Sequence, residues 1–215
     1  MAPAAPRVRM DPQVRLAILK GFARQVFAER GYSNSGLAEI AERAEVSKTL
    51  LYHYFPDGRP EIMAAVMDGL LADLTAVTTE ALDRAAGIDA RIRNWVETFL
   101  TFFVDQPDAF RLLFREPWGS GDPLVTVRSF RAMVDLSRQL VDPFGLDQAS
   151  AAALVTLTTG TIGLVVAVTE QVLAGKAEYE TAAEAAADFV IGGISRLRPP
   201  APGAPADRSR TPPRS

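Results

Sequence analysis

The 215-residue chain contains no cysteine and a single histidine, His53. The absence of cysteine excludes disulfides, thiolate zinc sites, iron–sulfur clusters and cysteine nucleophiles. A single histidine excludes a multi-histidine metal site and leaves His53 as the sole base for a serine–histidine–acid triad. We therefore expect no metal, no cofactor and no catalytic residue, and we predict that the protein is not an enzyme.

The sequence also lacks strand-like alternation of apolar and polar residues, and its start lacks the apolar run of a signal peptide. Hydrophobic residues make up 48% of the chain and charged residues 23%, which is enough for a buried core. This composition predicts a soluble, all-α protein of the cytoplasm.

Charge is divided unevenly along the chain. The first 59 residues carry a net charge of +3, whereas the remaining 156 carry −6. A basic N-terminal part followed by an acidic remainder is the asymmetry expected when only the N-terminal part contacts phosphate groups. The charge pattern therefore favours a nucleic-acid partner for the N-terminal part.

Residues 11–58 are predicted to form a three-helix DNA-binding module behind a flexible arm, residues 1–10. Asp11 and Pro12 predict a helix start, and an apolar stripe through Val14, Ile18, Phe22 and Val26, with Leu19 and Phe27 beside it, runs towards Arg30 before Gly31 ends the helix. A second helix is expected after Ser35 as its cap.

A third helix should begin after Ser47, because a serine side chain can cap it, and should stop at Phe55 because Pro56 follows. A tight turn between the last two helices makes a helix-turn-helix. Ala41 and Leu51 are expected to meet where these helices cross, since only a small residue at position 41 lets the backbones approach.

The third helix, within "VSKTLLYHYF", is predicted to have two unlike faces. At about 100° per residue, Leu51 and Phe55 share one side while Thr49 and His53 lie roughly opposite. The two borders are formed by Lys48 with Tyr52 and by Leu50 with Tyr54. The apolar face would anchor the helix, and the other would present groups that can bind base edges or phosphates.

The remainder, residues 59–198, is predicted to be a helical dimerisation domain, followed by a disordered proline-rich tail, residues 199–215. Helices are expected at roughly 60–84, 88–104, 107–115, 122–141, 147–174 and 179–197.

Residues 148–169 form a segment without charged residues, and this segment is long enough to span a membrane. Five threonines, two glycines and the lack of a flanking basic cluster favour a buried helix instead, and we expect no membrane partner. A single helix-turn-helix covers a short half-site, so a dimer is needed. We expect the last two helices to form a four-helix bundle with a second copy.

Large aromatic residues are concentrated between the DNA-binding module and the last two helices, which we expect to form the dimer interface. They are Trp95, Phe99, Phe102, Phe103, Phe110, Phe114, Trp118 and Phe130. An ordinary hydrophobic core explains such a cluster as well as a binding site does. Three acids, Glu97, Glu116 and Glu170, are candidates for binding a cationic ligand. The alternative is that each is a solvated surface residue.

The segment "GYSNSGLAEIAERAEVSKTLLYHYF", residues 31–55, resembles the TetR family of transcriptional regulators. The resemblance lies in Gly31-Tyr32, Ile40-Ala41, Val46-Ser47-Lys48 and Leu51-Tyr52-x-Tyr54-Phe55. It covers about 60 residues, and the rest of the chain matches in being helical and of typical length. The resemblance implies a ligand-responsive regulator, most often a repressor, that binds a double-stranded DNA operator as a homodimer.

The resemblance further implies that Lys48 and Thr49 reach bases, that residues 52–54 hold phosphates or base edges, and that Ser35 touches backbone phosphate. The DNA-contacting residues predicted in this way are Ser35, Ser47, Lys48, Thr49, Leu50, Tyr52, His53, Tyr54 and Arg59. By the same resemblance, residues 59–198 are a helical ligand-binding and dimerisation domain, in which some of the aromatic residues line a cavity for a small apolar or amphipathic effector and Thr158, Thr159 or Ile162 closes one wall.

Two positions depart from the family pattern. Glu45 stands where the turn usually has glycine, and a left-handed glutamate costs about 1 kcal/mol or more. The segment "FPDGRPEI" lacks the lysine that usually opens the fourth helix, which makes Arg59 the candidate for that phosphate contact. Two alternatives stay open: a helical adaptor that has lost DNA binding, and a small-molecule enzyme. The sequence does not indicate the operator, the effector or the regulated genes.

Overall fold

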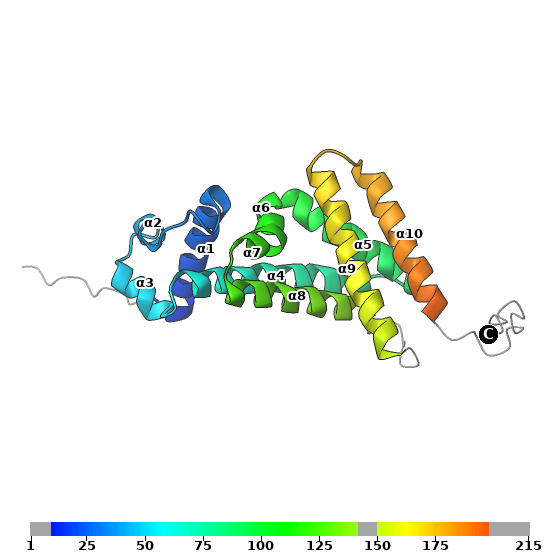
Figure 1. Ribbon diagram of the computed structural model, residues 1–215, viewed down its shortest axis with the longest axis horizontal. Helices are drawn as coiled ribbons and strands as arrows, with labels where there is room; N and C mark the ends of the chain where they lie inside the picture. Colours follow the sequence, from blue (N-terminus) through cyan, green and yellow to red (C-terminus); the bar gives the residue numbers. More distant parts are fainter. Residues whose placement is uncertain (1–9, 142–149, 198–215) are drawn as a thin grey trace, which may run out of the picture.

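The computed structural model describes residues 10–141 and 150–197, and these residues fold into helices without strands (Figure 1). The predicted all-α class is therefore confirmed. The predicted N-terminal arm, apart from Met10, and the predicted proline-rich tail lie outside the described residues. The helices are α1 (Pro12–Arg30), α2 (Leu37–Arg43), α3 (Lys48–Tyr54), α4 (Arg59–Asp83), α5 (Ile88–Asp105), α6 (Pro107–Phe110), the π-helical turn η1 (Arg111–Arg115), α7 (Glu116–Gly119), α8 (Pro123–Val141), α9 (Ala151–Leu173) and α10 (Tyr179–Leu197).

Helix α1 begins where the sequence predicts, because the Asp11 carboxylate accepts hydrogen bonds from the backbone N–H groups of Gln13 (2.7 Å) and Val14 (3.3 Å). Its buried face differs from the prediction and consists of Leu19, Ala23, Val26 and Phe27. Val14 and Ile18 are 51% and 39% exposed. These two positions lie about 100° or more around the helix from Leu19, so they fall outside the buried stripe.

The predicted serine cap of α2 is wrong. The N-cap is Gly36, which makes no side-chain capping bond. Ser35 is 2% exposed, and its hydroxyl donates to the Gly31 carbonyl oxygen at 2.5 Å. The reason is that the end of α1 leaves carbonyl groups without helical partners, and the Ser35 hydroxyl satisfies one of them.

Helix α4 runs from the end of the molecule formed by α1, α2 and α3 along the remaining helices, where it lies beside α8 (Figure 1). Its buried positions recur every three or four residues, as a helix with one core-facing side requires, and include Ile62, Met63, Val66, Met67, Leu70 and Leu74. One continuous helix therefore connects the two parts of the chain, and α1 also packs against it.

The second domain ends in an antiparallel pair formed by α9 and α10 (Figure 1). Most helices from α4 onward lie close to their predicted bounds, with one exception. The helix predicted at 107–115 continues to Gly119 and contains the π-helical turn Arg111–Arg115. By length and composition α4 and residues Ala152–Leu173 could cross a membrane, but core helices of soluble proteins meet the same criteria.

Candidate nucleic-acid interface

Helix α3 is fixed in the fold by one apolar side. Leu51 and Phe55 are 1% and 3% exposed and belong to the same core as Ile40 and Ala41 of α2. The Ser47 hydroxyl accepts a hydrogen bond from the Leu50 N–H at 3.1 Å and so caps the helix as predicted. The orientation of α3 about its own axis therefore follows from the apolar spacing.

The opposite side of α3 faces solvent. Ser47, Lys48, Thr49 and His53 are exposed, and Tyr52 is 50% exposed. Lys48 forms no ion pair with any residue that the structure describes, so its ammonium group is available to an external anion.

The two predicted borders of α3 differ from each other. Leu50 and Tyr54 are half-buried, and Tyr54 packs against the core with its ring edge-on to His53, 5.4 Å between centroids. This border is therefore less available to a ligand than the one formed by Lys48 and Tyr52.

The turn between α2 and α3 has the left-handed residue that the sequence suggests. Glu45 has φ 53°, the sole positive φ of a non-glycine residue in the described ranges. The Val46 N–H donates to the Ala41 carbonyl at 2.9 Å and the Glu45 N–H to the Glu42 carbonyl at 3.0 Å, a Schellman motif. The end of α9 has the same pair of bonds, but there the left-handed residue is Gly175.

An ion-pair network ties α2 to α1. The Arg43 guanidinium donates to both oxygens of Glu29, at 2.8 and 2.6 Å, and to Glu39 at 3.0 Å. The hydrogen bond from Arg43 holds the pKa of Glu29 below its ordinary value. Arg30 also pairs with Glu39, at 3.4 Å, so two arginines balance the two acids and lower the repulsion that these would exert on a nearby phosphate.

Two predicted phosphate contacts have partners inside the protein. Ser35 is buried, and we correct its assignment because its hydroxyl is held by Gly31 rather than exposed to DNA. The Arg59 Nη1 donates to the carbonyl oxygens of Ser33 and Ser35 at 3.2 Å each. Arg59 therefore positions the loop before α2, and contact with DNA would require it to leave these bonds.

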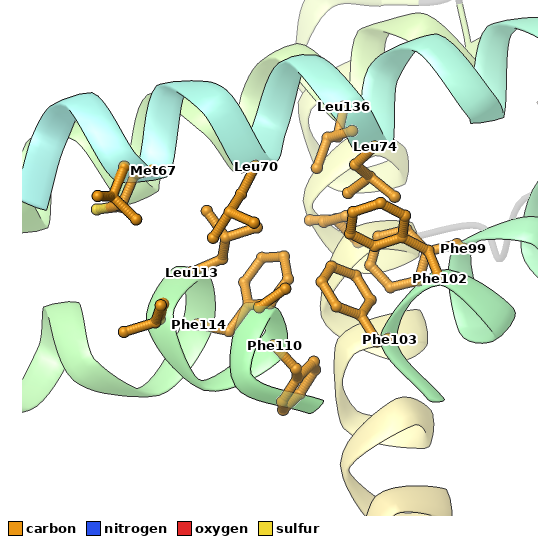
Figure 2. Close-up of a cluster of buried hydrophobic side chains, with 14 of the residues drawn as sticks. Met67, Leu70, Leu74, Phe99, Phe102, Phe103, Phe110, Leu113, Phe114 and Leu136 are labelled. Carbon is orange, nitrogen blue, oxygen red and sulfur yellow. The ribbon is translucent and has the colours of Figure 1, made fainter. Parts of the chain in front are cut away.

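The predicted aromatic cluster is largely a packed core (Figure 2). Six of its members, Trp95, Phe99, Phe102, Phe103, Phe110 and Phe114, are at most 8% exposed. Phe103 lies at the centre, with ring centroids 5.0 to 5.5 Å from those of Phe99, Phe102, Phe110 and Phe114. Most of these contacts are edge-on, the arrangement that aromatic rings favour.

Other predicted cavity residues lie elsewhere. Phe130 is 58% exposed on α8 and Thr159 is exposed on α9, so neither joins the aromatic core; both fall on outward faces of their helices. Ile162 is buried and Thr158 half-buried, with the Thr158 hydroxyl donating to the Leu154 carbonyl. The side chain of Trp118 lies outside what the structure describes.

The three acids considered for a cationic ligand have different surroundings. Glu116 accepts a hydrogen bond from the Tyr32 N–H at 2.9 Å, and Glu170 pairs with Arg115 at 2.7 Å. Neither carboxylate is therefore free. Glu97 is exposed and lines an open hollow of about 360 Å³ between α4, α5 and the start of α10, to which Phe102 also contributes.

Sequence reasoning missed the contacts between the loop that follows α1 and the α6–α8 segment. Glu116 meets Tyr32 and Asp122 accepts from the Tyr32 hydroxyl at 3.1 Å, although 84 and 90 residues separate them in sequence. Burial and the hydrogen bond to Asp122 raise the pKa of Tyr32. No local pattern signals such pairs, because each partner is an ordinary polar residue of its own helix or loop.

Helices α2 and α3, joined by a tight turn and with the polar side of α3 facing solvent, form a helix-turn-helix, a motif that proteins use to bind DNA. The model of the family described as bacterial regulatory proteins, tetR family, matches residues 19–66. The HTH-type transcriptional activator FasR of Mycolicibacterium smegmatis is 34% identical over 96 residues, which are 45% of this chain and 43% of that protein. The match thus spans less than half of this relative's length.

Solved structures share the fold over most of the chain. A TetR-like transcriptional regulator from Rhodococcus sp. RHA1 has TM-score 0.64 and 24% identity, covering 87% of this chain and 99% of its own. The fatty acid degradation regulator FadR from Bacillus halodurans has TM-score 0.67 and 15% identity, covering 82% and 98%. Together the family model, the relative and the fold support a TetR-family transcriptional regulator.

Proposed function

We propose that the protein is a DNA-binding transcriptional regulator, a repressor that acts as a homodimer and responds to a small ligand. The observation that carries the proposal is the exposure of Lys48, Thr49, Tyr52 and His53 on a helix anchored by Leu51. A helix held in this way can enter a major groove while its buried side keeps the polar side chains in register.

In this proposal Lys48 and Thr49 contact bases, and Tyr52 and His53 hold phosphates or base edges. Ser47 leaves the N-terminal end of α3 open towards the DNA backbone. Leu50 and Tyr54 contribute from the half-buried border. Arg59 and Ser35 act indirectly, by holding the loop that leads into α2.

The proposal is tested by incubating the purified full chain with fragmented genomic DNA and sequencing the fragments retained. We expect enrichment of one sequence with two half-sites about 34 to 36 Å apart, or a multiple of that distance. Retention without sequence enrichment, or no retention, would contradict the proposal. The second outcome would favour the helical adaptor that has lost DNA binding.

A matched pair of lysine variants locates the interface. Lys48→Ala should weaken binding to the enriched fragment by about tenfold or more, because one good base contact contributes about 1–3 kcal/mol. Lys176→Ala removes the same charge from the exposed turn after α9 and should leave binding unchanged. Equal effects of the two variants would show that net charge, rather than the α3 face, governs binding.

Dimerisation is proposed for the outer side of α9 and α10. Val155 and Phe189 are 64% and 69% exposed there. Gly160, Gly163 and Gly192 have nothing within 4 Å of the position that a Cβ would take. An apolar surface with small residues allows close packing of helices, and a second copy would supply the partners in a four-helix bundle.

The ligand is proposed to enter the second domain next to the aromatic core, where Phe99, Phe103 and Ile162 offer apolar contacts. Ligand would favour a state in which α4 tilts and the two α3 helices no longer match one turn of DNA. Its chemistry would be apolar or amphipathic, because the core around Phe103 consists of aromatic rings.

Repression is the sign that we propose, although the Mycolicibacterium smegmatis relative is named an activator. A reporter gene placed downstream of the enriched fragment distinguishes repression from activation. Deletion of the regulator raises reporter expression if the regulator is a repressor and lowers it if the regulator is an activator. We place the protein in the cytoplasm and assign it no enzymatic activity. Turnover of a small molecule without DNA binding would support the enzyme alternative instead.

A further inference from the structure

A set of contacts, which we call the clasp, holds the end of α1 against the α6–α8 segment. At its outer side, the Arg24 Nε donates to Asp108 at 2.8 Å and the Arg24 Nη2 donates to Gln106 at 3.0 Å. The Arg111 guanidinium donates to the backbone carbonyl of Ala28. An arginine at the C-terminal end of a helix satisfies carbonyl groups that have no helical partner.

The inner side of the clasp is centred on Tyr32, the residue that follows Gly31 at the end of α1. The Tyr32 N–H donates to Glu116 at 2.9 Å, and the Tyr32 hydroxyl donates to Asp122 at 3.1 Å. Tyr32 is 2% exposed, so these bonds form in a partly dehydrated environment where they are stronger. A Cβ at Gly31 would lie 3.2 Å from the Glu116 carboxylate, which shows how closely the two segments approach.

The clasp is directly connected to the aromatic core. Phe110 and Phe114 come immediately before and within the π-helical turn Arg111–Arg115, and both rings contact Phe103 at 5.5 Å between centroids. Glu116 is the next residue after this turn. A single residue, Arg115, therefore separates the core aromatic Phe114 from Glu116, whose carboxylate holds Tyr32.

A π-helical turn contains one residue more than an α-helical turn, and such turns are often found at functional sites. Conversion of the Arg111–Arg115 turn to regular α-helix would rotate the following side chains by about 100°. Glu116 would then leave Tyr32. Regular α-helix would be the second arrangement of this turn, and an element with two discrete arrangements is what transmission of a signal between two sites requires.

We propose that Glu116 and Tyr32 are positioning residues that fix the DNA-binding module on the second domain, and that the π-helical turn releases them when the aromatic core rearranges. This inference rests on the proposed function, since it identifies how a ligand at the core would act on α3. Arg59 extends the effect, because it contacts the Tyr32 ring and holds the loop before α2.

The first experiment measures amide hydrogen exchange at Gly31–Ser35 in the full chain without DNA. In Glu116→Ala the Tyr32 amide should exchange about tenfold faster or more, because it loses a hydrogen bond to a charged group. Asp188→Ala is the control, since it also deletes a carboxylate bound to an arginine, Arg93, but between α5 and α10. Unchanged exchange at Tyr32 in Glu116→Ala, or equal exchange in both variants, would overturn the clasp.

Tyr32→Phe provides a second variant that keeps the buried ring and removes only the hydroxyl bond to Asp122. It should speed exchange at Gly31–Ser35 while helicity by circular dichroism stays the same. A faster exchange over the whole DNA-binding module, with loss of helicity, would indicate a general structural role and would count against a positioning role.

The coupling is tested by Phe114→Leu and Phe102→Leu. The two phenylalanines are 7% and 8% exposed and both contact Phe103, but Phe114 alone belongs to the π-helical turn. Phe114→Leu should speed exchange at Tyr32, whereas Phe102→Leu should not. An equal effect of both variants, or no effect of either, would overturn the coupling.

Domain orientation can be measured on the same variants, because the chain has no cysteine. Spin labels at Glu42→Cys and Val104→Cys, both exposed sites, report the distance between α2 and α5. Dilution with unlabelled chain removes distances between subunits. Phe114→Leu should broaden or shift this distance and Phe102→Leu should leave it unchanged; an unchanged distance in both variants would contradict the coupling.

None of these measurements uses DNA. If they fail while Lys48→Ala still weakens DNA binding as expected, the proposed clasp is wrong and the proposed regulator function stands. If fragment selection fails while exchange at Tyr32 responds as expected, the proposed function is wrong and the interdomain coupling stands.

Discussion

The guanidinium carbon of Arg59 lies 4.6 Å from the centroid of the Tyr32 ring. The same side chain donates to the carbonyl oxygens of Ser33 and Ser35. Arg59 opens α4, so this contact joins the first turn of the long connecting helix to the loop that precedes the helix-turn-helix. The Arg59 side chain, which the sequence predicts to bind phosphate, therefore has its partners within the protein.

Arg59→Lys should lower the free energy of unfolding by about 1–2 kcal/mol. Lysine keeps the charge, but its compact and strongly hydrated ammonium cannot stack its plane on the Tyr32 ring, and it weakens the two carbonyl bonds that Nη1 makes. Urea denaturation measures the change, and Arg84→Lys at the other end of α4, in an exposed ion pair, should have little effect. Unchanged stability combined with weaker DNA binding would restore Arg59 as a phosphate contact.

Glu45→Gly should raise the free energy of unfolding by about 1 kcal/mol. The left-handed conformation of Glu45 costs roughly 1–2 kcal/mol for a residue with a Cβ, and the greater freedom of glycine in the unfolded chain offsets part of the gain. The midpoint of urea denaturation reports it. Glu42→Gly is the control: it also removes a glutamate but lies within α2, and it should destabilise by about 0.5–1 kcal/mol. A lower midpoint for Glu45→Gly would mean that its side chain stabilises the turn.

Phe103→Ala should lower the free energy of unfolding by about 3–5 kcal/mol, because the ring is fully buried against four other rings. Phe130→Ala makes the same substitution at a 58% exposed site and should change stability by less than about 0.5 kcal/mol. Thermal and urea denaturation measure both variants. A small effect of Phe103→Ala would indicate that the ring borders an open cavity instead of a packed core.

Phe189→Arg should convert a dimer to a monomer. The substitution places a charge at a 69% exposed position on the outer side of α10, where a second copy would bury it without a partner. Light scattering after size-exclusion chromatography gives the mass. Val104→Arg, at a 39% exposed site on α5, should leave the mass unchanged. A dimer that survives Phe189→Arg would place the interface elsewhere.

Asp108→Asn should destabilise the protein at neutral pH but not in acid. Burial raises the pKa of Asp108, but the hydrogen bond and charge of Arg24 and backbone N–H groups outweigh it, so the pKa lies below its ordinary value. A lowered pKa in the folded state stabilises above the unfolded pKa, about 4, and this stability is lost as pH falls through the folded pKa.

The measurement for Asp108 compares urea midpoints of the two proteins at pH 7 and in steps below pH 4. The difference should shrink as the pH falls. Asp73→Asn, which removes one exposed charge from α4, should show no such difference at pH 7. A gap between wild type and Asp108→Asn that is independent of pH would show that Arg24 does not act through the charge of Asp108.

The division of α3 into a buried side and a solvent-facing side could be predicted because its determinants are local. Leu51 and Phe55 are four residues apart, Ser47 caps the helix that contains them, and helical geometry then places Lys48 and His53 outside. The left-handed Glu45 was predictable for the same reason, since the turn between two neighbouring helices demands it.

The remainder could not be predicted because it depends on contacts between distant segments. Ser35 resembles a helix cap in sequence, yet the packing of Tyr32 draws its loop inward. Phe130 belongs to the aromatic composition of the second domain but lies on the outward side of α8. The domain bounds, the site residues and the ligand cavity stay predictions that the experiments above address.

The clasp also bears on attempts to recombine such regulators. If residues 11–58 were fused to the second domain of another regulator, Arg24 would lose its partner Asp108 and the Tyr32 amide would lose Glu116. A hybrid that keeps these contacts would therefore have to contain residues 106–122 together with residues 11–58. The two segments that must be transplanted together are not continuous in the sequence.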